Sequence, residues 1–88
     1  MQIKSGFMLK EVAGSNIVVP VGENTVDFNA MITLNESGAF LWQQLEKECS
    51  MADLVKVMTS EYDVDAETAE KDINTFLNVI RNAGLLNE

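Results

Sequence analysis

The sequence has no histidine, one cysteine, one proline and six basic residues among its 88 positions. The absence of histidine removes the most common proton shuttle and the most common nitrogen ligand for metal ions. Cys49 has no second cysteine with which to form a disulfide, and no histidine to activate it as a nucleophile. The apolar runs are far too short to span a bilayer, and no long apolar segment follows the start. These absences argue against an enzyme, and we expect a soluble, cytoplasmic protein.

The charge balance is strongly acidic, with 14 Asp and Glu residues against six Lys and Arg residues and a formal net charge of -8. Such a surface repels nucleic-acid phosphates and anionic lipids, so we expect neither nucleic acid nor a membrane as partner. Basic or apolar partners are favoured. Hydrophobic residues make up 47% and charged residues 23% of the chain, ordinary values for a folded protein. The length predicts a single domain over residues 1–88 with one small core.

Two features could suggest chemistry, but structural roles explain both better. Carboxylates gather around the start of the third expected helix, at Asp63, Asp65, Glu67, Glu70 and Asp72. A calcium loop requires a glycine at its turn, and residues 62–67 contain none. Helix capping and solvation account for these side chains, so we expect no metal site and no cofactor. Cys49 is better suited to an apolar contact with Leu54 at a helix start than to catalysis.

The first part of the chain predicts a β-hairpin. Residues 7–13 and 16–21 have the pattern of two short strands. They are joined around Gly14 and Ser15, where glycine can supply the positive φ angle of a type II′ turn. Pro20 lacks an amide donor and therefore belongs at a strand end or on an outer edge.

A polar loop over residues 22–29 is expected after the hairpin, and residues 31–34 form the last strand. This strand passes directly into a helix at Asn35. The Asn35 side chain can accept a hydrogen bond from the amide of Ser37 or Gly38, which the first helical turn leaves without a partner.

Three helices are expected after this junction. The first runs over residues 36–47. The second begins at Ser50, whose hydroxyl forms a capping box with Asp53, and it ends near Tyr62.

The third helix is capped by Asp65 and ends before Gly84, which suits a left-handed residue beyond the last turn. A helical wheel places one apolar stripe on it: Ala69, Ile73, Phe76, Leu77, Ile80 and Ala83. Asp72 and Val79 lie on one flank of this stripe, and Asn74 and Arg81 lie on the other.

These elements predict an α+β fold, winged-helix-like, in which a three-stranded antiparallel sheet is followed by three helices. A sheet of three strands keeps an exposed edge, and the unpaired amides and carbonyls of an edge can pair with another chain.

The run from Ile32 to Trp42 places a β-branched strand, a capping asparagine and an apolar helix in direct succession. Two strands precede it, and two helix patterns follow it as far as Leu86. This order resembles the PqqD-like family, named for pyrroloquinoline quinone biosynthesis protein D, from about Gly6 onward. The resemblance implies a peptide chaperone that is not an enzyme. Such a precursor-peptide recognition element binds the leader segment of a ribosomally synthesised precursor and presents it to a modifying enzyme, commonly of the radical S-adenosylmethionine type.

In PqqD-like domains the leader docks between the third strand and the third helix. The resemblance therefore implies a peptide-binding site at these positions: Ala30, Met31, Ile32, Thr33, Thr75, Val79 and Asn82. The leader would pair its backbone with the edge strand by β-strand addition. Ile73, Phe76 and Ile80 would build the floor of the groove. Arg81 could pair with an acidic leader residue, whereas the acidic remainder of the domain favours a leader with lysine or arginine; the sequence leaves both open.

Two alternatives belong to other classes. A winged-helix module for protein interaction or transcription would need no precursor peptide, and a small enzyme would turn over a substrate alone. DNA binding ranks below peptide binding, because the third helix offers only Lys71 and Arg81 for phosphate contacts.

Overall fold

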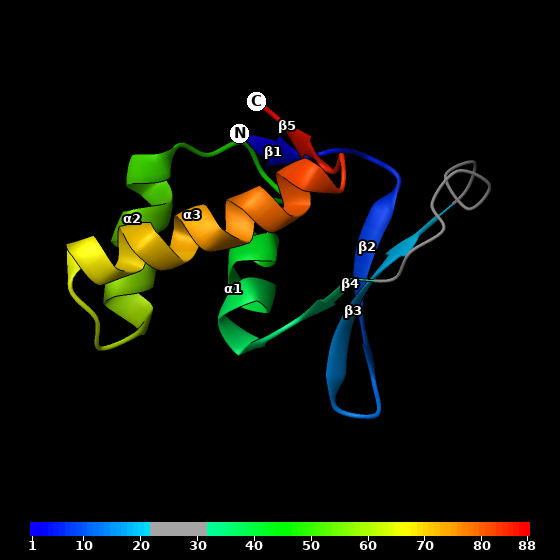
Figure 1. Cartoon of the computed structure of the whole chain (residues 1–88), viewed down its shortest axis with the longest axis horizontal. Helices are drawn as coiled ribbons and strands as arrows, with labels where there is room; N and C mark the ends of the chain where they lie inside the picture. Colours follow the sequence, from blue (N-terminus) through cyan, green and yellow to red (C-terminus); the bar gives the residue numbers. More distant parts are fainter. Residues whose placement is uncertain (22–31) are drawn as a thin grey trace.

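A β-hairpin and a short third strand stand beside three packed helices in the computed structural model, which describes residues 1–21 and 32–88 (Figure 1). Helix α3 crosses in front of α1 and α2, and the hairpin projects from one side. The elements are β1 (Gln2–Ile3), β2 (Phe7–Val12), β3 (Ser15–Pro20), β4 (Ile32–Leu34), α1 (Glu36–Gln44), α2 (Met51–Glu61), α3 (Ala66–Asn82) and β5 (Leu86–Asn87).

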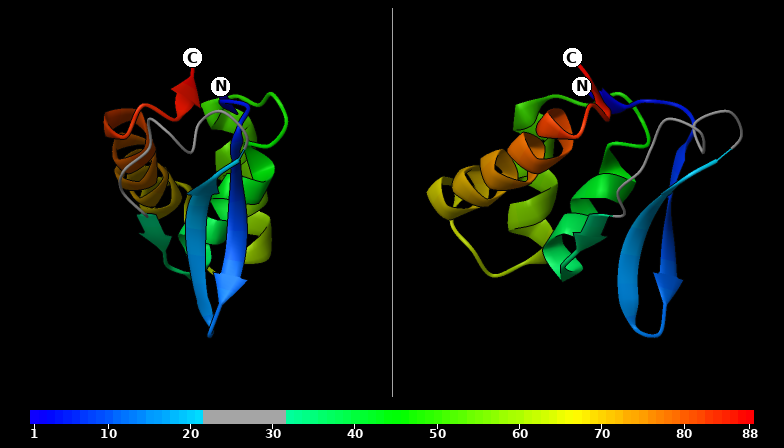
Figure 2. Two further views of the ribbon diagram at one scale, coloured as in Figure 1. Left: turned by 90° about the vertical axis from the view of Figure 1, so that its right-hand side faces the viewer. Right: turned by 45° about the vertical axis from the view of Figure 1, so that its right-hand side comes forward.

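The larger sheet is antiparallel with the strand order β2-β3-β4, so β2 and β4 are its edges. Ile17 on β3 pairs with Lys10 on β2 and with Thr33 on β4. In Figure 2, β4 lies on the side of the sheet nearest α3. The expected three-stranded antiparallel sheet followed by three helices is confirmed.

The hairpin turn differs from the expected one. Val12 pairs with Ser15, so the two turn residues are Ala13 and Gly14, with φ angles of 52° and 82°. Positive φ at both positions defines a type I′ turn, not a type II′ turn centred on Gly14 and Ser15. The strand register places an alanine in the left-handed region, at a cost of about 1 kcal/mol. Pro20 is the last residue of β3, as expected for a residue without an amide donor.

A second sheet, absent from the sequence-based expectation, joins the two ends of the described chain. Strand β1 pairs with β5, with Ile3 opposite Leu86 (Figure 1). Two-residue strands are too short to show a periodicity. The Cys49 amide also donates to the Met1 carbonyl at 2.9 Å, which ties the first residue to the segment between α1 and α2.

Helix α1 ends at Gln44, three residues before the expected Lys47. The Leu45 carbonyl accepts a hydrogen bond from the Ile3 amide at 2.9 Å, instead of from an amide one turn further along a continued helix. This contact with β1 therefore ends α1. It could not be predicted from the local sequence pattern, because the two residues lie far apart in the chain.

The caps of the other helices are as expected. The Ser50 hydroxyl accepts from the Asp53 amide at 3.1 Å, and the Asp53 carboxylate accepts from the Ser50 amide at 3.0 Å, which completes a capping box. The Asp65 carboxylate accepts from the Thr68 amide at 2.7 Å. Gly84 follows α3 with a φ angle of 77°. Hydrogen bonds from these backbone amides lower the pKa of both Asp53 and Asp65.

The core lies between the three helices and the inner face of the larger sheet. Its most buried large side chains include Trp42, Leu45, Leu54, Ile73, Leu77 and Ile80. Ala83, expected on the buried stripe of α3, is instead the exposed C-cap residue one position beyond the helix. Leu41, not assigned to the core from sequence, is 1% exposed. Within the described residues, no helix has both the length and the apolar character to cross a bilayer.

Candidate functional site

A groove of about 420 Å³ lies between the edge strand β4, the start of α1 and helix α3. Ten of the described residues line it: Thr33, Leu34, Asn35, Ser37, Gly38, Leu41, Asp72, Thr75, Phe76 and Val79. The strand-to-helix junction thus supplies one wall, and the third helix supplies the other.

The floor of the groove is apolar because it is the edge of the core. Leu34, Leu41 and Phe76 are 7%, 1% and 7% exposed. Gly38 keeps this floor close to α3: a Cβ atom there would lie 3.0 Å from Asn35 Oδ1 and 3.5 Å from Phe76 Cδ1. An added Cβ would therefore crowd the Asn35 cap of α1, whereas it would meet the Phe76 ring at an ordinary contact distance.

The wall formed by α3 is one face of the helix. Four groove residues belong to it, and they begin with Asp72. Thr75, Phe76 and Val79 follow Asp72 by three, four and seven positions, so the four side chains lie one above another. Val79 is 45% exposed, although it carries a large aliphatic side chain. An exposed apolar residue beside a buried ring offers a contact for an apolar ligand.

The wall formed by β4 offers backbone groups. Val12 and Ser15 flank a two-residue turn and form a hydrogen-bonded pair, so Lys10 and Ile17 form the next such pair along the ladder. Ile17 therefore directs its amide and carbonyl to β2, and its other partner, Thr33, belongs to a non-hydrogen-bonded pair. The amide and carbonyl of Thr33 point away from β3, toward the side where β4 has no strand partner among the described residues.

The structure brings three of the seven residues of the expected peptide-binding site together in the groove: Thr33, Thr75 and Val79. Ile32 is half-buried and packs against the core instead, and Asn82 is the exposed last residue of α3, outside the groove lining. Ala30 and Met31 lie outside the described residues.

Of the expected floor residues, Phe76 lines the groove, whereas Ile73 and Ile80 are buried without lining it. Sequence reasoning did not assign Asp72 to the site. The signal was present, because the helical wheel already grouped Asp72 with Val79 on one flank.

Arg81 is engaged elsewhere. Its Nε and Nη2 atoms donate to the two carboxylate oxygens of Glu88 at 3.0 and 2.7 Å, and its Nη1 donates to Asn78 Oδ1 at 2.9 Å. These hydrogen bonds raise the pKa of Arg81 and lower that of Glu88. Arg81 is not part of the groove lining.

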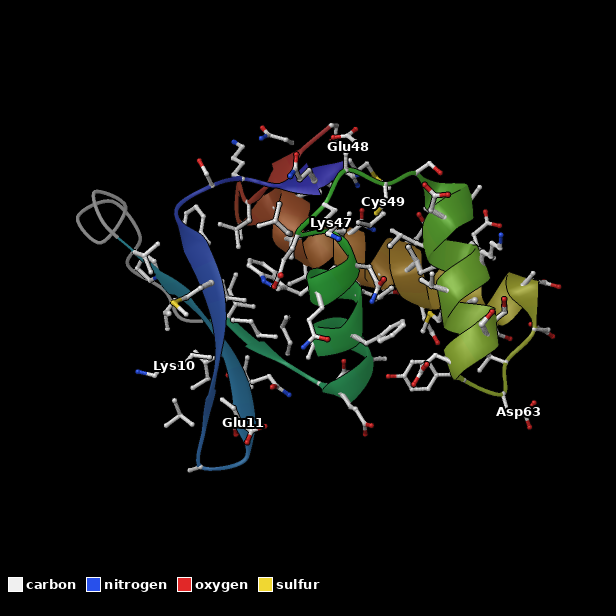
Figure 3. The ribbon with its side chains drawn as sticks, turned by 180° about the vertical axis from the view of Figure 1, so that it is seen from behind. Lys10, Glu11, Lys47, Glu48, Cys49 and Asp63 are labelled. Atoms are coloured by element: carbon white, nitrogen blue, oxygen red, sulfur yellow. The ribbon has the colours of Figure 1, made fainter. Side chains whose placement is uncertain are left out.

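The described residues contain no cluster of three or more His, Cys, Asp or Glu side chains that could hold a metal ion. Cys49 lies between α1 and α2, next to Glu48 and the first strand (Figure 3). Its Sγ atom lies 3.7 Å from the Gln44 carbonyl, and its side chain packs against the core. Burial raises the pKa of the Cys49 thiol, so the nucleophilic thiolate is disfavoured.

The family model for coenzyme PQQ synthesis protein D (PqqD) matches residues 16–86, from β3 to β5. The chain belongs to the PqqD family. The resemblance carried by the junction after β4 is thereby confirmed, and the matched range includes every residue that lines the groove.

Two solved structures share the fold of this PqqD family member. One is TbiB1 in complex with the TbiA(beta) leader peptide, with a TM-score of 0.77, 23% identity, and coverage of 99% of this chain and 95% of that one. The other is lasso peptide synthetase B1 complexed with the leader peptide, with a TM-score of 0.75, 22% identity, and coverage of 99% and 96%. A search of curated proteins gave no match.

Proposed function

We propose that residues 1–88 form one peptide-recognition domain. It binds the leader segment of a ribosomally synthesised precursor as an added strand along β4 and presents that precursor to a modifying enzyme. The observation that carries this proposal is the groove between β4 and α3, where backbone groups on one wall face an apolar floor and the exposed Val79. Membership of the PqqD family and the leader-peptide complexes of the two structural relatives support it.

The binding mechanism divides into two contributions. The backbone of an extended leader pairs with the amide and carbonyl of Thr33, which supplies affinity for almost any sequence. Alternate leader side chains point to the same face of the new strand, so every second residue enters the groove and meets Leu34, Phe76 and Val79. These contacts select among leaders.

The domain itself acts as a binding protein and not as an enzyme. The chain has no histidine, and burial raises the pKa of its one thiol, which disfavours the nucleophilic thiolate. Chemistry therefore belongs to the partner, for which a radical S-adenosylmethionine enzyme is the family expectation, together with any iron-sulfur cluster. We place this assembly in the cytoplasm, where newly synthesised precursors are available to it.

The test is a titration of the labelled domain with the leader of a precursor encoded beside its gene, followed by NMR. The proposal predicts shifts in the backbone signals of Ile32–Leu34 and in those of Thr75–Val79. Shifts confined to α2, or no binding of any neighbouring precursor, would contradict it. A duplex DNA titration in parallel addresses the winged-helix alternative, for which a salt-sensitive complex at low micromolar concentration would be the supporting result.

A further inference from the structure

Asp72 is the only charged residue among the ten described residues that line the groove. It is exposed on α3, and its carboxylate makes no hydrogen bond or ion pair with any other residue in the described ranges 1–21 and 32–88. Among the described residues, the groove therefore combines an apolar floor with a single unpaired negative charge.

The cations of the described chain do not neutralise that carboxylate. Arg81 is held by Glu88 and Asn78, and Lys71 lines a neighbouring hollow on α3 with Glu67 and Glu70. Lys10 projects from the hairpin away from the helices (Figure 3). The net charge of -8 on the whole chain also favours approach by a cationic partner.

We propose that Asp72 selects leaders that carry lysine or arginine at one defined position. The inference rests on the proposed function. It resolves the choice that the sequence left open, because the cation that could have received an acidic leader residue is occupied by Glu88. A cationic leader residue gains an ion pair with Asp72, whereas an acidic one meets a like charge in a groove with no described counter-ion.

The geometry of α3 also sets the spacing between two leader residues: the cation that pairs with Asp72 and the apolar residue that contacts Val79. Asp72 and Val79 are seven positions apart on α3, a rise of roughly 10 Å, which is close to the length of about three residues of extended chain. Residues on the same face of a strand are spaced by two or four. The preferred leader therefore has its lysine or arginine two or four residues from an aliphatic or aromatic residue.

The test uses a display library of random twelve-residue peptides, selected separately on wild type, Asp72→Lys and Glu70→Lys. Wild type should enrich lysine or arginine at one position, and Asp72→Lys should enrich aspartate or glutamate at that position. Glu70→Lys introduces the same change of charge on the same helix, outside the groove, and should retain the wild-type preference. A synthetic peptide pair that differs only by Lys or Glu at that position should then differ in Kd on wild type by about three- to tenfold, and the order should invert on Asp72→Lys.

The possible failures are distinguishable. Enriched peptides without a preferred cation, or with a preference that Asp72→Lys leaves unchanged, overturn the role of Asp72 while peptide recognition stands. If no peptide is enriched by any folded variant, the proposed function is overturned and the inference with it. Thermal melts of both variants should match wild type, because Asp72 and Glu70 are exposed.

Discussion

The Oδ1 atom of Asn35 accepts a hydrogen bond from the Gly38 amide at 2.8 Å, and both residues line the groove between β4 and α3. The contact that begins α1 therefore also shapes one wall of the proposed binding site. Asn35 therefore contributes both to the stability of α1 and to the shape of the groove.

Replacement of Asn35 by alanine should lower stability by about 1 kcal/mol, because the first turn of α1 loses its side-chain acceptor. For a chain of this length the melting temperature should fall by about 4–8 °C. Asn74→Ala makes the same chemical change at an exposed position within α3, where the higher helix propensity of alanine should leave the melting temperature equal to that of wild type or slightly raised. If both variants melt like wild type, Asn35 does not stabilise the helix.

Thr33→Pro should reduce leader affinity tenfold or more, because proline removes the amide that points away from β3. Thr33→Val is the matched control, since it removes the hydroxyl but keeps the amide, and it should bind within about twofold of wild type. Calorimetry measures both affinities, and circular dichroism checks the fold. Equal affinity of a folded proline variant and wild type would exclude pairing at Thr33.

Val79→Asp should weaken leader binding with little loss of stability, because Val79 is 45% exposed and lines the groove. Ile73→Asp provides the contrast. Ile73 is fully buried, and an unpaired buried charge should unfold so small a domain. Thermal melts and leader titrations of both variants separate the two roles. A Val79→Asp variant that binds as tightly as wild type would show that the leader does not follow this flank of α3.

Stability should decline in acid through the helix caps. Asp53 and Asp65 have lowered pKa values in the folded chain, so each carboxylate contributes stability above its unfolded pKa of about 4, and that contribution is lost as pH falls through the lower folded pKa. The double variant Asp53→Asn, Asp65→Asn keeps acceptors at both positions but cannot titrate. Its melting temperature should fall less than that of wild type between pH 5 and pH 2, measured by circular dichroism. Parallel curves would show that these caps do not drive acid unfolding.

The features of the fold that could be predicted from sequence are those that depend on residues close together in the chain. The caps at Asn35, Ser50 and Asp65 follow from side-chain acceptors at fixed spacing, and they are confirmed. The early end of α1 could not be predicted, because it depends on the Ile3 amide, more than forty residues away. The type I′ turn was missed for a related reason: strand register, and not the glycine alone, decides which two residues occupy the turn.

The candidate site was predictable in outline but not in detail. Periodicity along α3 identified Val79 as a flanking apolar residue, and the edge position of β4 follows from strand order. The position of Phe76 beside Gly38 across the groove is a tertiary contact without a sequence signal. Likewise, the proposed preference for a basic leader draws on the pairing of Arg81 with Glu88, a contact that the sequence does not indicate.

The most direct test of strand addition is hydrogen–deuterium exchange of the Thr33 amide, read by NMR, in the free domain and at saturation with a leader that it binds. Pairing with a leader backbone predicts that exchange at Thr33 slows at least tenfold on binding, whereas the Ile17 amide, already paired within the sheet, changes little. A saturated complex in which Thr33 exchanges as fast as in the free domain would contradict recognition along β4.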